Sequence, residues 1–187
     1  MTSKIDIASL LCETTHIIQW AISLVPAERV NQPPPHANHP RSDKGFKTYF
    51  GDWSALHQVF HLAYYEKSYA IPGIQSFIDE APPSNDLIFP SSEQETRAFQ
   101  DALAAGVDLP TLLQSFLDGR ELQLQLLTNI PEEVWQKDSL HTGLGDVSAE
   151  FIVSKTIQHS LEHANDILKN ALYWERALSW LDRQAVD

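Results

Sequence analysis

Hydrophobic residues recur every three to four positions along most of the chain, which predicts a helical protein. The first helical segment covers residues 5–25, and Pro26 is expected to end or bend it. Its core-facing positions are Ile5, Ala8, Leu11, Thr15, Ile18, Ile22 and Val25. Residues 31–45 contain four prolines and one glycine, so they are predicted to form a long loop. His36 and His39 lie in that loop and are expected to be exposed to solvent.

The second helical segment is expected to begin after Gly51, with Asp52 as its N-cap residue, and to extend to about residue 80. Pro72 lies inside this segment and is expected to bend or divide the helix. The apolar face consists of Leu56, Phe60, Ala63 and Ile74, flanked by Trp53 and Tyr64. On a helical projection His57 lies nearer to this face than His61 does, which slightly favours His57 as the inward histidine without deciding between the two.

The third helical segment follows a connection at residues 81–92. Ser91 or Ser92 is the expected N-cap, because Ser92 and Glu95 have the spacing of a capping box. The helix is expected to break near residues 104–111, where a glycine and a proline occur, and to resume up to residue 130.

A last helical segment is expected from about Val147 to beyond Leu172, after a loop at residues 129–146, and residues 174–186 are expected to continue it. Its predicted core face is Val153, Ile157, Leu161, Ala164, Leu168 and Ala171. Four substantial helices with neither an alternating strand pattern nor a repeat predict an all-α fold. We expect one antiparallel four-helix bundle domain over residues 1–187, with a long loop between its first two helices.

The composition narrows the range of partners. The formal net charge of −12 disfavours binding to nucleic acid or to anionic lipid, since no dense group of lysines and arginines offsets it. No apolar run is long enough to span a bilayer, and no secretion signal is evident at the N-terminus. Cys12 is the single cysteine, which excludes an internal disulfide and suits a reducing cytoplasm. We therefore expect a cytoplasmic protein.

Two pairs of histidines with helical spacing are the candidate chemical groups: His57 with His61, and His159 with His163. Residues four apart lie one turn above each other, so each pair is able to give two imidazoles to one metal ion, with a third ligand from elsewhere. The second pair borders a half-buried strip with Ile152, Thr156, Ile167 and Asn170. The alternative is that these are boundary histidines that form hydrogen bonds with their neighbours. A metalloprotease motif is excluded, because Glu162 precedes the second histidine instead of following the first.

The sequence resembles the DinB-like (DinB/YfiT) superfamily of four-helix-bundle metalloproteins. The resemblance is carried by Trp53 and Ser54 at the start of the second helix, by His61 followed by leucine, and by the late pair "HSLEH". It implies a three-histidine metal site formed by His61, His159 and His163, with open positions for water or substrate. Nickel or zinc is the expected ion, although three imidazoles also suit other transition metals.

Characterised relatives in this superfamily include mycothiol-dependent maleylpyruvate isomerase and bacillithiol transferases. The resemblance therefore implies a metal-dependent hydrolase, isomerase or thiol transferase, with a low-molecular-weight thiol as a further candidate cofactor. Metal-bound water would supply a nucleophile near neutral pH. Lys67 and Lys155 are the cationic residues near the motifs, so the sequence itself does not support an anionic thiol partner.

Several neighbours of the histidines are weaker candidates. His57 is expected either to shape the pocket or to support a ligand histidine from outside the site. Asp166 is a candidate hydrogen-bond acceptor for His159, with a solvated carboxylate as the plainer alternative. Tyr65 lies one turn beyond His61, where it would line the pocket or pack in the core. Glu66 and Glu162 are expected to be solvated carboxylates.

The alternative function is a non-catalytic bundle used for partner binding or for formation of a homodimer. The C-terminal segment is rich in large apolar side chains, which would dock on the bundle or on a second copy of the chain. These side chains are Trp174, Leu178, Trp180 and Leu181.

Overall fold

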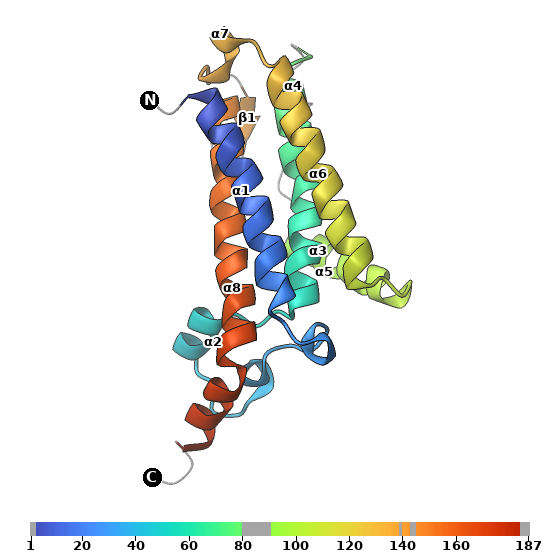
Figure 1. Ribbon diagram of the computed structural model, residues 1–187, viewed down its shortest axis with the longest axis vertical. Helices are drawn as coiled ribbons and strands as arrows, with labels where there is room; N and C mark the ends of the chain where they lie inside the picture. Colours follow the sequence, from blue (N-terminus) through green and yellow to red (C-terminus); the bar gives the residue numbers. More distant parts are fainter. Residues whose placement is uncertain (1–2, 80–90, 139, 143–144, 184–187) are drawn as a thin grey trace.

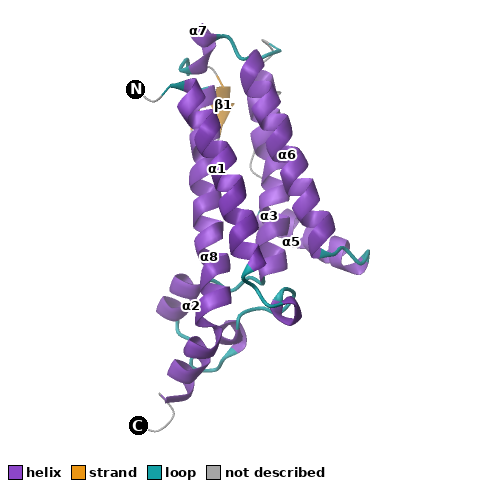
Figure 2. Cartoon of the chain, viewed as in Figure 1, coloured by secondary structure: helices purple, strands orange, loops and turns teal. Residues whose placement is uncertain are grey.

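A computed structural model describes residues 3–79, 91–138, 140–142 and 145–183 of the chain. Most of these residues are helical, so the predicted all-helical character is confirmed (Figure 2). Two short strands are the exception, and they lie in a region that was predicted to be a loop. None of the described helices combines the length and the apolar character that crossing a lipid bilayer requires.

Four long helices run side by side and form the body of the molecule (Figure 1). Helix α1 (Lys4–Ser23) packs along α8 (Ala149–Arg183), and α3 (Ala55–Tyr65) packs against α6 (Leu109–Asn129). Helix α1 also contacts α6, and α3 contacts α8, so each long helix has two such neighbours. This arrangement brings α3 and α8, which carry the histidine pairs, next to each other.

The apolar core consists of two clusters along the helices. One cluster is centred on Leu11, Tyr69 and Trp135, and the other on Ile18, Leu56 and Phe116. The histidines lie where the two clusters meet, because His159 and His163 fall along α8 between Val153 of the first cluster and Ala164 of the second. A group of polar side chains is thereby enclosed by apolar packing above and below.

Helix α1 begins with a capping box, in which Ser3 and Asp6 exchange hydrogen bonds. Its predicted core face holds except for Ile5, which is 81% exposed and was wrongly assigned to the core. At 100° per residue Ile5 lies about 120° from Leu11 around the helix, outside the buried stripe. Ile7 takes the corresponding place in the core.

The predicted loop at residues 31–45 is shorter than expected and partly helical. A 3-10 turn, η1 (Ala27–Arg29), precedes this segment. A second 3-10 turn, η2 (Pro35–Asn38), lies within it, and helix α2 (Lys44–Phe50) begins at its end. His36 is only 1% exposed, which contradicts its predicted exposure, because Phe46 and Phe50 cover its ring and its Nε2 donates to the carbonyl of Gly51.

The C-terminal part of α8 covers this folded connection within the same chain. The ring centroids of Phe50 and Trp180 lie 6.1 Å apart, and Leu181 is buried. His39 is also partly covered, with its Nε2 3.8 Å from the carboxylate of Asp182, so its predicted exposure to solvent was wrong. The apolar C-terminal residues thus pack against their own chain, which was one of the two predicted alternatives.

The second predicted helix is interrupted earlier than Pro72. Ser54, not Asp52, caps α3, because its Oγ accepts from the backbone N–H of His57. After α3 comes a π-helical turn, η3 (Glu66–Ala70), and then α4 (Ile71–Ser76), with Pro72 in its first turn. The expected end of this helix near residue 80 and most of the connection at 81–92 lie outside the described residues.

The third predicted helix is divided as expected into α5 (Ser92–Ala104) and α6. The capping box is formed by Ser91 and Gln94, one residue before the predicted pair of Ser92 and Glu95. This shift has a consequence for the site, because Glu95 is left free to interact with another helix.

Residues 129–146 contain regular structure that the sequence pattern did not predict. A short helix, α7 (Glu132–Trp135), precedes an antiparallel pair of strands, β1 (Leu140–Thr142) and β2 (Gly145–Val147). Gly145, the first residue of β2, has a φ of 96°, a conformation that favours glycine.

The buried face of α8 is rotated from the predicted one. Leu161 is 45% exposed, although it was assigned to the core. The buried positions are Ile152, Val153, Thr156, His159, Ser160, Ala164, Ile167 and Asn170. Val153 and Ala164 of the predicted face are buried, but hydrophobicity missed the inward positions that are polar, among them Thr156, Ser160 and Asn170. His159 therefore lies within the buried face, and His163 beside it is partly buried.

Candidate metal centre

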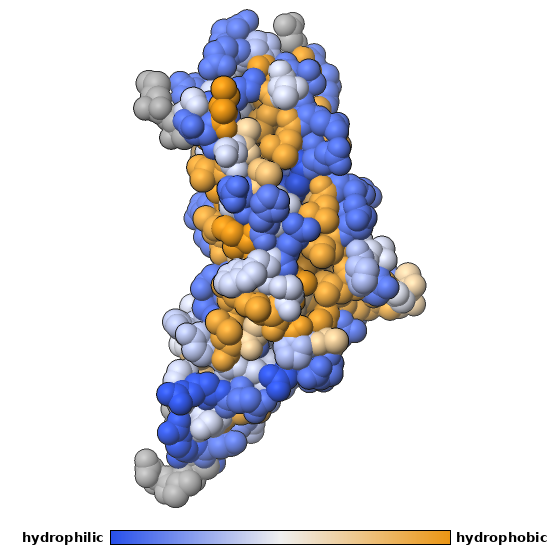
Figure 3. Space-filling model, viewed as in Figure 1, coloured by the Kyte–Doolittle hydropathy of each residue, from blue (hydrophilic) through white to orange (hydrophobic). Residues whose placement is uncertain are grey.

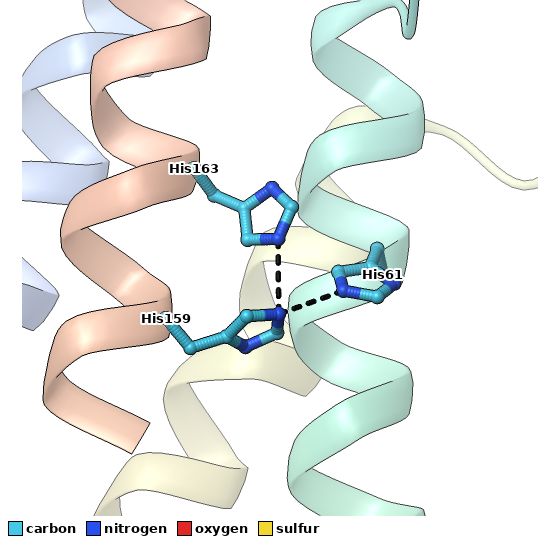
Figure 4. Close-up of side chains that lie close together, drawn as sticks. All are labelled: His61, His159 and His163. Carbon is cyan, nitrogen blue, oxygen red and sulfur yellow. Dashed lines mark hydrogen bonds between the residues drawn. The ribbon is translucent and has the colours of Figure 1, made fainter. Parts of the chain in front are cut away.

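Three histidines converge in the interior between α3 and α8 (Figure 4). His61 comes from α3, and His159 and His163 come from successive turns of α8. Nε2 of His159 lies 2.8 Å from Nε2 of His61 and 3.0 Å from Nε2 of His163. The structure thus brings together the three residues that the sequence predicted as ligands, and it leaves His57 outside the group.

The far side of two of the rings is fixed by hydrogen bonds from other helices. Nδ1 of His61 donates to the carboxylate of Glu95 on α5, and Nδ1 of His163 donates to Oε1 of Gln58 on α3. Because the Nδ1 atoms carry the protons, Nε2 of each of these rings presents a lone pair to the centre of the cluster. Neither partner was predicted from the sequence.

The lone pairs at the centre cannot all be satisfied by protons. His61 and His163 both direct Nε2 at Nε2 of His159. A proton on Nε2 of His159 would form a good hydrogen bond with only one of these two nitrogens. A cation placed between the three nitrogens would satisfy all of them. The donor set, three imidazole nitrogens, is one that zinc and nickel accept.

Burial keeps the imidazoles of His159 and His163 neutral. Burial lowers the pKa of His159 to about 2 and that of His163 to about 3, and the neighbouring histidines add to both shifts. Neutral imidazole is the form that binds a metal ion. At neutral pH, therefore, both rings are in the state required of ligands.

Two aromatic side chains form walls beside the cluster. The indole of Trp53 lies 5.0 Å from the ring of His61 and is nearly parallel to the ring of His163 at 6.0 Å. On the other side the phenol ring of Tyr65 lies 4.4 Å from the ring of His159. The prediction that Tyr65 would line the site or pack in the core fits its position, since it does both.

His57 has a different role from the other three histidines. Its ring is stacked between Trp53 at 4.3 Å and Phe99 of α5 at 4.0 Å. Burial lowers the pKa of His57 to about 4, so it too is neutral at pH 7. It shapes the neighbourhood of the cluster, as predicted, and helical projection was wrong to favour it as the inward histidine.

The other candidate residues have partners other than the three histidines. Asp166, the candidate acceptor for His159, instead pairs with Lys169 at 3.0 Å. Glu162 is exposed and accepts from Gln158, as expected of a solvated carboxylate. The expectation for Glu66 was wrong, because its side chain is 1% exposed and forms an ion pair with Arg120.

Sequence reasoning missed Glu95, Gln58 and Arg120. Glu95 was assigned to a helix cap, and Gln58 lies next to His57 in sequence, so neither suggested a histidine partner. A lone arginine in an amphipathic helix is normally exposed, and nothing in its local pattern marks Arg120 as buried.

No protein-family model matches the chain, and neither a curated protein nor a solved structure resembles it closely enough to count as a relative.

Proposed function

We propose that this protein is a cytoplasmic, metal-binding member of the DinB-like superfamily, with α1, α3, α6 and α8 as an antiparallel four-helix bundle. In this proposal His61, His159 and His163 hold one divalent transition metal, nickel or zinc. The observation that carries the proposal is the convergence of three Nε2 atoms. A proton on one of these atoms cannot form good hydrogen bonds with the lone pairs of both others.

The spacing of the nitrogens supports a metal of ordinary size. Imidazole–zinc bonds of about 2.0–2.1 Å separate two ligand nitrogens on one ion by about 3 Å or slightly more. The two measured separations, 2.8 and 3.0 Å, require little or no movement of the helices. The hydrogen bonds of Glu95 and Gln58 also support ligand function, because metal-binding histidines usually donate their second N–H to such acceptors.

The chemistry that we propose is metal-dependent catalysis by a hydrolase, isomerase or thiol transferase. A bound ion with three protein ligands supplies a Lewis acid and lowers the pKa of a coordinated water or thiol. Glu95 and Gln58 orient two of the imidazoles, while Trp53 and Tyr65 restrict the space around them. A low-molecular-weight thiol is a candidate co-substrate. Lys155 lies near enough for its charge to lower the pKa of His159.

The test is elemental analysis of protein purified without a histidine tag, for the parent, His163→Ala and His57→Phe. We expect about one equivalent of nickel or zinc in the parent and in His57→Phe, and none in His163→Ala. His57→Phe is the matched control because it removes an imidazole that lies beside the cluster but outside it, and because phenylalanine keeps the aromatic stack with Trp53 and Phe99. Absence of metal from the parent, even after incubation with zinc and nickel, would refute the proposal.

A second candidate function is a non-catalytic bundle that forms a homodimer. It is favoured by the apolar side chains on the outer surface of α1, where Leu10, Trp20 and Leu24 are exposed. Figure 3 shows apolar side chains gathered along the middle of this face, where α1 and α6 run together. Sedimentation of the parent and of Trp20→Glu tests it, since a dimer through this face would dissociate in the variant.

A further inference from the structure

A buried ion pair lies beside the histidine cluster. Nε of Arg120 on α6 is 2.8 Å from the carboxylate of Glu66 in η3, and the two side chains are 2% and 1% exposed. Removing two charges from water is costly, and an apolar pair of similar size is often at least as stable. Net stability is therefore a weak explanation for this pair, and its position suggests another.

The backbone around the pair is adapted to admit it. Glu66 is the first residue of the π-helical turn that interrupts the helix after His61, and such turns occur often at functional sites. On the facing helix, Gly119 has no side chain. A Cβ there would lie 3.0 Å from Cβ of Glu66, closer than such atoms normally approach. Two local features of different helices thus permit one buried carboxylate.

The pair extends to the helix that carries two of the histidines. Nη2 of Arg120 donates to Oγ of Ser160, which in turn donates to the carbonyl of Thr156 at 2.8 Å. Ser160 is fully buried and follows His159 directly in sequence. Tyr65, the residue before Glu66, packs on the ring of His159 from the other side. The ion pair therefore connects η3, α6 and α8 at the level of His159.

His159 needs such support more than its two partners do. His61 and His163 are each oriented by a hydrogen bond at Nδ1, to Glu95 and Gln58. The buried Nδ1 of His159 has no hydrogen-bond partner among the described residues. Its ring is thus placed by packing and by the backbone of α8, and Arg120 holds that backbone at the next residue.

We infer that Glu66 and Arg120, acting through Ser160, are positioning residues that set where His159 stands in the three-histidine cluster. The inference rests on the proposed metal-binding function. Arg120 suits the task because its guanidinium reaches the carboxylate and the hydroxyl at once with rigid geometry, whereas a lysine ammonium would lack this fork.

The test compares metal binding by the parent, Ser160→Ala, Arg120→Lys and the control Thr14→Val. Thr14 is also a buried hydroxyl on a long helix that donates to a carbonyl of the preceding turn, but it has no link to Arg120. Cobalt(II) is the probe, because its visible absorption reports the geometry of the ligands as well as their occupancy. Circular dichroism identifies the conditions in which each protein is folded.

We expect Ser160→Ala and Arg120→Lys to weaken cobalt binding about 10-fold, as loss of outer supporting contacts does elsewhere, and to alter the visible spectrum. Thr14→Val should bind as the parent does. Parent-like affinity and spectrum in both site variants would overturn the inference while leaving the proposed function intact. If the parent and all variants bind no cobalt, both the proposed function and the inference fall.

Discussion

The interior contains two polar clusters that differ in how their polar atoms are satisfied. The Glu66–Arg120–Ser160 cluster contains its own cation, which pairs with the carboxylate and donates to the hydroxyl, although Nη1 of Arg120 has no hydrogen-bond partner among the described residues. The histidine cluster has acceptors directed at one point and no cation of its own. The first cluster has its counter-charge as soon as the chain folds, whereas the second is suited to receive a positive ion from solution.

Among the substitutions, the largest effect is expected when the Glu66–Arg120–Ser160 cluster loses its cation. Arg120→Met should lower the free energy of unfolding by about 3–5 kcal/mol, because a buried carboxylate is left without its partner. Urea denaturation of the metal-free protein measures this. The double variant Glu66→Leu with Arg120→Met should recover most of the loss, since the charge and its partner are then both absent. If Arg120→Met alone is harmless, the comparison between the clusters fails.

Adding a cation should complete the second cluster. We expect zinc at 100 times its dissociation constant to raise the free energy of unfolding of the parent by about 2.7 kcal/mol, by preferential binding to the folded state. His159→Gln should show no such stabilisation, although its metal-free stability should stay close to that of the parent. Thermal or urea melts with and without zinc provide the measurement. An equal gain in both proteins would place the zinc elsewhere.

The two clusters should also respond to pH with opposite signs. Burial depresses the pKa values of His159 and His163 in the folded state, so the unfolded chain binds more protons below about pH 6.5. The metal-free protein should therefore lose stability as pH falls from 6.5 towards 4, by up to about 1.4 kcal/mol per pH unit for each of the two histidines.

Glu66 acts in the other direction. Burial raises its pKa to about 7 despite the opposing charge of Arg120, so its contribution weakens as pH rises between about 4.5 and 7. Urea melts at three pH values separate the two effects: His163→Ala should flatten the loss on the acid side, and Glu66→Gln should steepen it. A His163→Ala profile identical to that of the parent would contradict the assignment.

The smallest effect is expected at the supporting acceptors of the histidine cluster. Glu95→Gln retains a hydrogen-bond acceptor for Nδ1 of His61 but removes the negative charge of the carboxylate. Loss of this charge reduces the basicity of Nε2 of His61, and therefore its strength as a metal ligand. Zinc affinity should fall about 10-fold with little change in the stability of the metal-free protein. Competition with a chromophoric chelator measures it. Glu93→Gln, on the same helix and outside the cluster, is the control and should bind zinc normally.

The sequence predicted the helices better than their buried faces. The helical period of the apolar residues and the positions of the prolines located the long helices, because helix formation depends on local sequence. Leu161 and Ile5 were assigned to the core by hydrophobicity. In α8, however, the inward positions include Ser160, which meets Arg120, and Thr156, which meets Tyr65. A pattern based on apolar residues cannot represent a face that is buried through polar contacts.

The candidate site shows the same division. The spacing of His159 and His163 predicted that the two side chains lie close together, because residues four apart on one helix are one turn apart on the same face. His61 was chosen over His57 on resemblance, and helical projection pointed the other way. Glu95 and Gln58 were invisible, because which helix faces which imidazole depends on tertiary packing. Long-range partners of this kind have no local pattern in the chain.

The placement of the three histidines along the chain has a consequence for folding. His61 and His159 are 98 residues apart in sequence, and α5 and α6 lie between them. An ion held by both would act as a removable cross-link that closes a loop of this length. In the chain-entropy treatment a covalent link over about 100 residues restricts the unfolded chain by about 4.7 kcal/mol. Availability of the metal would then govern how long the protein persists before it unfolds, in addition to any chemistry at the ion.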